Sequence, residues 1–372
     1  MKAVVCYEFK KPLIIEDVTL DPPRENEVKI RIAATAICHS DIHSFNGEHG
    51  SSGLPAIGGH EISGYIDEVG KGVTYVKPGD HVVVSLARAG CGKCYYCTIG
   101  LPHMCQKNSA KPRRAGKEFS LSQTGRYVNK RGVRLSQMAG TIAGFAEYTT
   151  VSEDNIVKIP DDIPLDSAAL LGCGVISGYG AVINKAKVQP LSSVIIVGAG
   201  GVGLNVIQGA VISGAYPIIA VDILDKKLEA ARFFGATHTI NAKNNPDPVA
   251  AAWELTSGRG ADYVFIATAG LSVLRQGFDM SAKNGMNVII GHSAKESLSI
   301  FEPVEFISGR MLTGCGMGQA RLRMDIPRLV DLYKSGRFKL DELISGRYPL
   351  ENINEAIASS EKGEALRNVI VF

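Results

Sequence analysis

The chain has 372 residues, more than a single hydrophobic core usually supports, so we expect two domains. Hydrophobic residues make up 45% and charged residues 21%, proportions that are ordinary for a soluble globular protein. Eight cysteines in a chain of this length do not describe a disulfide framework. The apolar run at residues 1–6 is too short for a signal peptide, and the longest apolar region, 194–221, is interrupted by glycines. We therefore predict a cytoplasmic protein without a membrane span.

The formal net charge of +3 is unevenly distributed. Residues 106–134, the basic segment, contain nine Lys or Arg and a single acidic residue, Glu118. Nucleic acid is disfavoured as a partner, because the segment has no recognition helix and few aromatic residues that could stack on bases. A solvated surface loop is the preferred interpretation. A loop that lines the active cleft and favours an anionic substrate or cofactor phosphates is the alternative.

Residues 1 to about 150 are typical of a β-rich domain. Short runs rich in β-branched residues are separated by Gly, Pro, Asn and Asp, which are turn formers. Strands are predicted at 28–33, 62–69, 81–86 and 145–151.

From about residue 177 the pattern changes to strands that alternate with helices, which is typical of a parallel sheet with helical crossovers. A last segment begins at about residue 318, with a helix predicted at 325–335 and a final strand at 368–372. In the alternating part, strands are predicted at 194–197, 218–221, 263–267 and 288–290, and helices at 204–213, 225–234 and 249–256.

The stretch from Cys38 to His43 offers a thiolate, two imidazoles, a hydroxyl and a carboxylate within six residues. It begins where a predicted strand gives way to a turn. Later fragments contain His60, in Gly-Gly-His-Glu, and Cys173, in Gly-Cys-Gly. Two thiolates and one imidazole form a known ligand set for catalytic zinc, and a site with three ligands leaves one tetrahedral position open for water or substrate. We therefore predict a catalytic zinc site at Cys38, His60 and Cys173.

A second group of cysteines occupies residues 91–105 with the spacing Cys-x2-Cys-x2-Cys-x7-Cys. Gly90 and Gly92 let the backbone fold around a metal ion, and the tight spacing lets one loop supply every ligand. Cys6 and Cys315 remain, and we predict that both are buried free thiols. The pattern predicts a closed structural zinc site with four thiolate ligands, Cys91, Cys94, Cys97 and Cys105.

The strand at 194–197 is followed by Gly-Ala-Gly-Gly-Val-Gly and then by a predicted helix. A G-x-G-x-x-G sequence alone is weak, but this one lies between a strand and a helix, and Asp222 ends the next strand at the expected distance. The glycines permit a tight turn, the approach of a pyrophosphate to the helix N-terminus and close packing of helix on strand. Asp222 can bind both ribose hydroxyls and would repel a 2′-phosphate, so we predict NAD rather than NADP. The predicted contacts are Gly198, Gly200, Gly201, Val202, Gly203 and Asp222.

Taken together, these motifs resemble the zinc-dependent medium-chain alcohol dehydrogenases over essentially the whole chain. The resemblance implies an α/β fold: a GroES-like β-rich catalytic domain (1–175), a Rossmann doubly wound parallel-sheet domain that binds NAD (176–317), and a return to the catalytic domain (318–372). It also implies a homodimer or homotetramer joined through the Rossmann sheets. It rests on Cys-His-Ser-Asp from residue 38, Gly-His-Glu at 59–61, the cysteines of 91–105, Gly-Cys-Gly at 172–174, the nucleotide fingerprint and the C-terminal Leu-Arg-Asn-Val-Ile-Val-Phe.

The resemblance also implies roles for individual residues. Ser40 resembles the hydroxyl that takes the substrate proton, and His43 the solvent end of that relay, reached through the nicotinamide ribose. Asp41 resembles the carboxylate that orients His60, and Glu61 a carboxylate behind the metal that enters its coordination sphere transiently. Alternatively, His39 and His43 could each be a surface imidazole, and Lys227 could be a solvated lysine on a helix. The implied cofactor contacts are His39 and Arg367 with the pyrophosphate and Lys227 with the adenosine ribose.

Two positions depart from the family pattern. Ala87, four residues before Cys91, stands where relatives often place an aromatic residue that lines the substrate pocket, so we expect a wider pocket. His292 follows a predicted strand near the expected nicotinamide, where an apolar residue is usual. Both departures argue against a simple short-chain alcohol as substrate.

The predicted activity is reversible hydride transfer from a primary or secondary alcohol to NAD, which gives an aldehyde or a ketone. One alternative is a thiol-dependent formaldehyde dehydrogenase, which oxidises a hydroxymethyl-thiol with the help of the basic segment and the wide pocket. A second is a family member that retains its nicotinamide tightly. A non-catalytic zinc- and dinucleotide-binding protein is the alternative from another class, and the presence of every element needed for catalysis argues against it.

Overall fold

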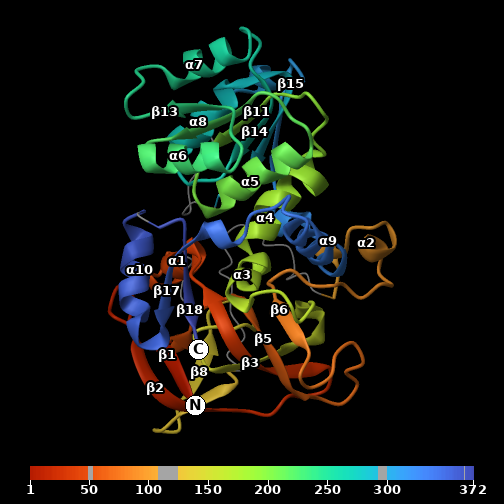
Figure 1. Cartoon of the computed structure of the whole chain (residues 1–372), viewed down its shortest axis with the longest axis vertical. Helices are drawn as coiled ribbons and strands as arrows, with labels where there is room; N and C mark the ends of the chain where they lie inside the picture. The colour runs from red at the N-terminus through yellow and green to blue at the C-terminus, as the bar shows by residue number, and fades with distance from the viewer. Residues whose placement is uncertain (49–52, 108–124, 292–299, 364) are drawn as a thin grey trace. The chain divides into compact units, whose positions relative to one another are not determined.

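The computed structural model describes residues 1–48, 53–107, 125–291, 300–363 and 365–372, and Figure 1 shows its elements coloured along the chain. The chain divides into two compact units. Unit 1 comprises Met1–Cys173, Arg321–Ser335 and Leu340–Phe372, and unit 2 comprises Gly174–Ala320 and Gly336–Lys339. The last part of the chain therefore belongs to the same unit as the first part.

A closed barrel of short strands forms one part of unit 1. Gly132, with φ +77°, allows the tight turn between two of its strands, because this backbone conformation is strained for other residues. Ile57, Tyr127 and Leu135 are fully buried and belong to one core cluster of the barrel. Around the barrel the strands are β1 (Lys2–Cys6), β2 (Ile14–Leu20), β7 (Tyr127–Asn129), β8 (Arg134–Gln137) and β4 (Ala56–Ile57).

An open sheet forms the second part of unit 1, with β3 (Glu27–Ala36) as an inner strand. Val28 and Ile30 of β3 are buried and alternate with charged residues that are not, as expected for a strand with one face on a core. β18 (Arg367–Val371) pairs antiparallel with β3 and lies beside it in Figure 1. The sheet order is β10 (Ile156–Lys158), β6 (His81–Val84), β5 (Glu61–Val69), β3, β18 and β17 (Ile344–Pro349), and β9 (Tyr148–Ser152) also pairs with β3.

A helix, α1 (His39–Phe45), follows β3, so the turn that we predicted at this point is wrong. The helix forms because Asp41, in its first turn, reaches back to the backbone N–H of Cys38 at the N-cap position. Ile42 and Phe45 then bury in a core cluster of unit 1. The other helices of unit 1 are α2 (Tyr95–Thr98), α3 (Leu165–Ala169), α9 (Leu322–Lys334) and α10 (Ile353–Glu361), with 3-10 turns η1 (Pro102–Met104), η2 (Glu153–Asn155), η3 (Leu170–Gly172), η7 (Asp341–Leu343) and η8 (Leu350–Asn352).

Unit 2 is built on a parallel sheet whose strands run in the chain order 3-2-1-4-5-6, which is the Rossmann arrangement. The strand that comes first in this sheet along the chain, β11 (Val194–Val197), is buried along its whole length, because helices cover parallel sheets on both faces. In sheet order the strands are β13 (His238–Asn241), β12 (Ile218–Asp222), β11 (Val194–Val197), β14 (Ala261–Ile266), β15 (Ser281–Ile289) and β16 (Met311–Gly314).

Helices connect these strands, and those predicted near 204–213, 225–234 and 249–256 are confirmed. Among the described residues no single helix is long and apolar enough to cross a membrane; by length and composition alone, one consecutive pair, Leu165–Gly172 with Gly174–Ala186, would qualify. The helices of unit 2 are α4 (Gly174–Gly180), the π-helix η4 (Ala181–Ala186), α5 (Gly201–Ile212), α6 (Asp225–Phe233), α7 (Pro248–Leu255) and α8 (Leu271–Asp279), with 3-10 turns η5 (Pro303–Phe306) and η6 (Met317–Gln319).

Candidate active site and metal centres

Asp41, on the first turn of α1, connects three segments of unit 1. Its Oδ2 accepts a hydrogen bond from the Cys38 N–H (3.2 Å), and its Oδ1 accepts from the Gly59 N–H (3.0 Å) and lies 2.9 Å from Nδ1 of His60. Asp41 and His60 are only 3% and 2% exposed, so water does not compete for these contacts. Because Asp41 holds Nδ1 of His60, the ring's Nε2 is left as the atom that can bind a metal ion.

Register within the sheet brings the predicted zinc ligands together. β3 and β5 pair so that Ala36 lies opposite Glu61, which places Cys38 and His60 just beyond the same end of the strand pair. Cys173 follows η3 and belongs to the same group. Ligand atoms of Cys38, His60, Glu61 and Cys173 all lie within 4.8 Å of one another. Two sulfurs, an imidazole and a carboxylate are a donor set that suits zinc, so these residues fit the predicted ion.

The two sulfurs of this group share a hydrogen bond that separates their charges. It lowers the pKa of Cys38 well below its usual value and raises the pKa of Cys173 well above its own. Burial by itself would lower the pKa of His60, but the charges of Asp41 and Cys38 outweigh burial and raise it. The group therefore concentrates negative charge in a buried place, which favours a bound cation.

Glu61 is fully buried, and its carboxylate forms an ion pair with Arg367 of β18. Burial raises the pKa of Glu61 to about 7, against the opposing charge of Arg367. Arg367 is 6% exposed, and its Nε has no hydrogen-bond partner within the described residues. The pair thus leaves one buried donor of Arg367 for a further acceptor.

Ser40 lies next to the predicted metal ligands. Its Oγ is 3.2 Å from Cys38 Sγ and 3.3 Å from His60 Nε2. A hydroxyl at this position is close enough to exchange a proton with an oxygen bound near these ligands.

His43 lies one turn further along α1, with its ring centroid 6.4 Å from that of His39. Its Nδ1 is 2.5 Å from Oε2 of Glu48. Glu48 was not among the residues that we predicted from sequence. A signal for it was present: Gly47 follows the apolar end of α1, and a glycine directly after a helix folds the next residue back toward the last turn.

Ala87 lies close to the segment that carries Cys173. It is 7% exposed, and its N–H donates to Oγ of Ser85 (3.1 Å), which in turn donates to the carbonyl of Gly172 (2.6 Å). A small side chain therefore occupies the position where an aromatic residue would fill space. His292 lies outside the described residues, as do residues 108–124 of the basic segment.

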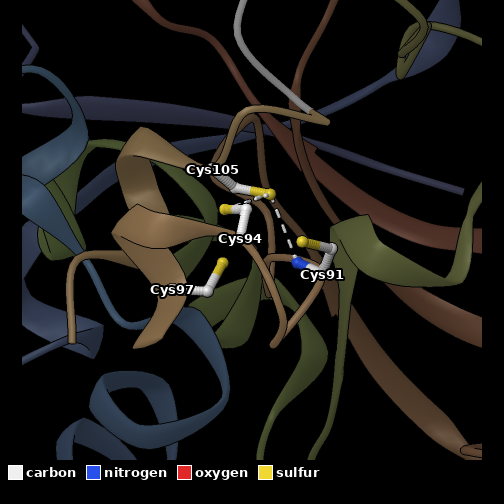
Figure 2. Close-up of side chains that lie close together, drawn as sticks. All are labelled: Cys91, Cys94, Cys97 and Cys105. Atoms are coloured by element: carbon white, nitrogen blue, oxygen red, sulfur yellow. Dashed lines mark hydrogen bonds between the residues drawn. The ribbon is translucent and has the colours of Figure 1, made fainter. Parts of the chain in front are cut away.

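The second group of cysteines lies in the loop around α2 and η1. Figure 2 shows the four sulfur atoms turned toward one another, and they too lie within 4.8 Å of one another. Cys105 is fully buried, accepts the Cys91 N–H at 3.3 Å and lies 3.9 Å from Cys94, sulfur to sulfur. Gly90, with φ +86°, passes close to the sulfur of Cys97, because a Cβ on this glycine would lie only 2.9 Å from it. Four sulfurs in this arrangement match a closed zinc site.

In unit 2 the turn between β11 and α5 requires glycine at Gly198, which has φ +97°, and at Gly203. A Cβ on Gly203 would lie 1.9 Å from the carbonyl oxygen of Gly198, so helix and turn pack as closely as backbone allows. A Cβ on Gly200, the N-cap of α5, would meet nothing within 4 Å. The N-terminus of α5, which begins with Gly201 and Val202, is therefore open to a pyrophosphate.

Asp222 ends β12 beside this turn. Its Oδ2 accepts the Ala199 N–H (2.8 Å), and its Oδ1 accepts the N–H groups of Ile223 and Leu224 (2.8 and 3.1 Å). These bonds hold a carboxylate where the ribose of a dinucleotide is expected. Lys227 is half-buried on α6, which starts three residues after Asp222.

Comparisons with known proteins agree with this geometry. The family models "Alcohol dehydrogenase GroES-like domain" and "Zinc-binding dehydrogenase" match residues 24–161 and 201–335. The chain is 37% identical to the S-(hydroxymethyl)glutathione dehydrogenase of Saccharomyces cerevisiae over 373 residues, which cover 99% of this chain and 95% of that protein. It is 39% identical to the alcohol dehydrogenase class-3 of Pisum sativum, over 99% of this chain and 97% of that protein. The chain belongs to the zinc-dependent medium-chain alcohol dehydrogenase family.

Solved structures of alcohol dehydrogenases share the fold over the whole chain. Benzyl alcohol dehydrogenase from Acinetobacter calcoaceticus aligns with a TM-score of 0.89 and 34% identity, covering 100% of this chain and 99% of that one. An alcohol dehydrogenase zinc-binding domain protein from Burkholderia ambifaria gives the same TM-score and identity, covering 100% and 98%. The chain is a zinc-dependent alcohol dehydrogenase that uses NAD, and its homologues act on small-molecule alcohols or aldehydes. The predicted fold class, enzyme class, zinc and NAD are confirmed.

Proposed function

We propose that this alcohol dehydrogenase oxidises primary or secondary alcohols with a bulky substituent, reversibly and with NAD. The observation that carries the proposal is Ala87, a small residue whose backbone N–H is connected through Ser85 Oγ to the carbonyl of Gly172, next to Cys173. A methyl group at this position occupies less of a substrate pocket than an aromatic ring would, which favours an alcohol with an aromatic or branched group over ethanol. The similarity to the benzyl alcohol dehydrogenase of Acinetobacter calcoaceticus also supports a bulky substrate.

In this proposal Cys38, His60 and Cys173 hold the catalytic zinc, and Glu61 stands behind it. Bound zinc supplies a Lewis acid that lowers the pKa of the alcohol hydroxyl, and bound NAD accepts the hydride. Ser40 takes the proton of the alcohol, which its place between two ligand atoms supports. The proton leaves through His43, and the cysteines of 91–105 hold a second, structural zinc.

Two of the proposed cofactor contacts are supported by hydrogen bonding within their own unit. Arg367 keeps a buried Nε for a pyrophosphate oxygen, which supports its role, and Asp222 is fixed for the adenosine ribose. The remaining contacts are His39 with the pyrophosphate, Lys227 with the ribose, and the turn and helix start at Gly198, Gly200, Gly201, Val202 and Gly203.

A hydroxymethyl-thiol is the second candidate substrate. Relatives named S-(hydroxymethyl)glutathione dehydrogenase, from Saccharomyces cerevisiae and Komagataella pastoris, are 37% and 38% identical over nearly the whole chain. The basic segment adds positive charge that would suit an anionic thiol.

The test is NAD reduction by the purified, zinc-loaded protein with aliphatic, aromatic, branched and anionic alcohols, each with and without glutathione and formaldehyde. We expect kcat/KM for benzyl alcohol to exceed that for ethanol by at least about tenfold, because one or two buried apolar groups contribute this much. In Ala87→Phe the ratio of kcat/KM for benzyl alcohol to kcat/KM for ethanol should be smaller. Turnover only with formaldehyde and a thiol would select the second candidate, and silence across the panel would point to retained nicotinamide, to be sought in the denatured protein.

We further propose a cytoplasmic homodimer or homotetramer that assembles through unit 2, without nucleic acid or membrane partners. In the described residues its sheet ends at β16, where Met311 is 40% exposed, and nearby Val304 and Ile307 are 61% and 83% exposed. An edge strand with exposed apolar residues suits pairing with a second copy. Light scattering coupled to gel filtration tests the assembly, and a monomer at micromolar concentration would contradict it.

A further inference from the structure

The end of α1 places a carboxylate against the outer histidine of the helix. His43 Nδ1 lies 2.5 Å from Glu48 Oε2, and the two side chains are 29% and 40% exposed. The predicted proton path ends at His43, so a partner that fixes its ring bears on catalysis.

The backbone builds this contact. The N–H of Glu48 bonds to the carbonyl of His43 (2.9 Å), and the N–H of Gly47 bonds to that of Ser44 (3.0 Å). Together with a left-handed Gly47 (φ +75°), these bonds form the Schellman motif that ends many helices. The motif sets its first and last residues side by side, and in many proteins both are apolar. Here they are an imidazole and a carboxylate.

Gly47 cannot be replaced without cost. Its φ is strained for other residues, and a Cβ at this position would lie 3.1 Å from the ring of Phe9. The carbonyl of Phe45 also accepts the N–H of Lys10 (3.0 Å), which attaches the helix end to the N-terminal loop. Backbone hydrogen bonds therefore hold Glu48 and His43 in position, in addition to the contact between their side chains.

We propose that Glu48 is a positioning residue of the proton path: it accepts Nδ1–H of His43 and leaves Nε2 as the base. The inference rests on the proposed role of His43. The proton given up by the alcohol, passed on from Ser40, forms a bond to Nε2 of His43, and Nδ1–H stays with Glu48, whose charge stabilises the imidazolium. Nε2 then releases the proton to water, so the dyad returns to its starting state and no electrons move.

Water can reach the dyad from a cavity of about 600 Å³ that Glu48 helps to line. Ile42, Phe45 and Ile357 contribute an apolar lining from α1 and α10. Among the described residues, the charged and titratable groups that line this cavity or lie near His43 include His39 on α1, Lys10 and Lys11 of the N-terminal loop, and Glu361 at the end of α10. Glu361 lines the same cavity, and its replacement serves as the matched control.

The first test does not depend on activity. In protein labelled with 15N-histidine, at pH 9, above the ordinary imidazole pKa of about 6.5, the ring nitrogen shifts report the tautomer of His43, whose signals are assigned by their loss in His43→Gln. We expect the Nδ1–H tautomer in the native protein and in Glu361→Gln, and a mixture in Glu48→Ala. An Nε2–H tautomer in the native protein, or no change in Glu48→Ala, would overturn the proposal.

The second test measures turnover. Glu48→Ala should lower kcat by about tenfold with little change in KM, and most at low pH, where solvent base is scarce. Imidazole added to the buffer should restore part of the loss, and Glu48→Gln, which keeps the size but not the charge, should fall in between. Equal kcat in Glu48→Ala and Glu361→Gln at every pH would contradict the proposal. If His43→Gln loses no activity, the relay itself fails, whereas the nitrogen shifts still decide the dyad.

Discussion

The two groups of proposed metal ligands in unit 1 are built in different ways. In each, the ligand atoms lie within 4.8 Å of one another. The four cysteines come from one loop of residues 91–105, and three of them are partly exposed. The catalytic group joins the start of α1, the start of β5 and the end of η3, and His60 and Glu61 are 2% and 0% exposed. One group can organise its own loop around an ion, whereas the other is organised by the sheet.

The two groups also differ in which parts of the chain stabilise the charges of their ligands. In the loop, backbone N–H groups lower the pKa of Cys94 to about 6, while burial and Cys94 raise the pKa of Cys97 to about 11. In the catalytic group, side chains from distant segments set the charge, with Asp41 behind His60. The loop therefore carries its own anion-stabilising donors. The catalytic site depends on contacts that exist only in the folded sheet.

Removing one catalytic sulfur should have the largest effect. In Cys38→Ser we expect kcat to fall by about 10³-fold or more, because the Lewis acid contributes several kcal/mol to the transition state. Zinc per subunit should fall by about one of two ions, measured by atomic emission, while NAD binding to unit 2 persists in calorimetry. Undiminished turnover in protein that has lost this zinc would refute the assignment of the catalytic site.

Removing one sulfur of the loop should act on stability instead. In Cys97→Ser we expect Tm to fall by about 5–10 °C, because a loop without its own core loses its ion. The kcat of the folded fraction should fall far less than in Cys38→Ser. Circular dichroism during heating and zinc analysis check this contrast. If Cys97→Ser lost activity as completely as Cys38→Ser while its Tm stayed unchanged, the distinction between the two sites would be wrong.

This contrast also explains what could be predicted from sequence. Cys91, Cys94, Cys97 and Cys105 lie within fifteen consecutive residues, so their spacing can be recognised from the sequence alone. For the catalytic group the ligand types could be recognised, but their meeting depends on the register that sets Ala36 opposite Glu61. That register has no signature in any short stretch of the chain.

Three features escaped prediction because they arise from pairing between distant or unexpected partners. α1 replaced the predicted turn, since an aspartate rather than a glutamate closes its capping box. Arg367 meets Glu61 because β18 pairs with β3, hundreds of residues away in the chain. Glu48 contacts His43 through the Schellman motif at the end of α1, and Gly47 is the one residue whose type indicates this motif in the sequence. In unit 2 the strands β11, β12 and β14 were predicted closely, because buried parallel strands are continuous apolar runs, whereas β13 and β16 were not predicted.

Removing the charge of Asp41, which contacts the proposed zinc ligand His60, should have a smaller effect. Asp41→Asn keeps the size and the acceptor for the Cys38 N–H but loses the charge beside His60. We expect the catalytic zinc to bind about 10- to 100-fold more weakly, as for other carboxylates behind a metal-bound histidine, with the loop zinc retained. Competition with a chelator measures both sites. Asp80→Asn, a buried aspartate that caps Lys77 and pairs with Lys158, is the control and should leave zinc affinity unchanged.

The smallest expected effect concerns a carboxylate outside both sites. Glu61 and Glu305 each pair with an arginine, but burial raises the pKa of Glu61 to about 7, whereas hydrogen bonds from Arg275 lower the pKa of the more exposed Glu305 from 4.5 to about 2. A carboxyl with a lowered folded-state pKa stabilises the fold fully above its unfolded value of 4.5, and this stability is lost as the pH falls from 4.5 toward 2. The Tm difference between the native protein and Glu305→Gln should therefore be present at pH 6 and shrink by pH 3. Glu229→Gln, an exposed glutamate on α6, is the control; a Tm difference for Glu305→Gln that stays constant from pH 6 to pH 3 would show that Arg275 does not hold the carboxylate charge.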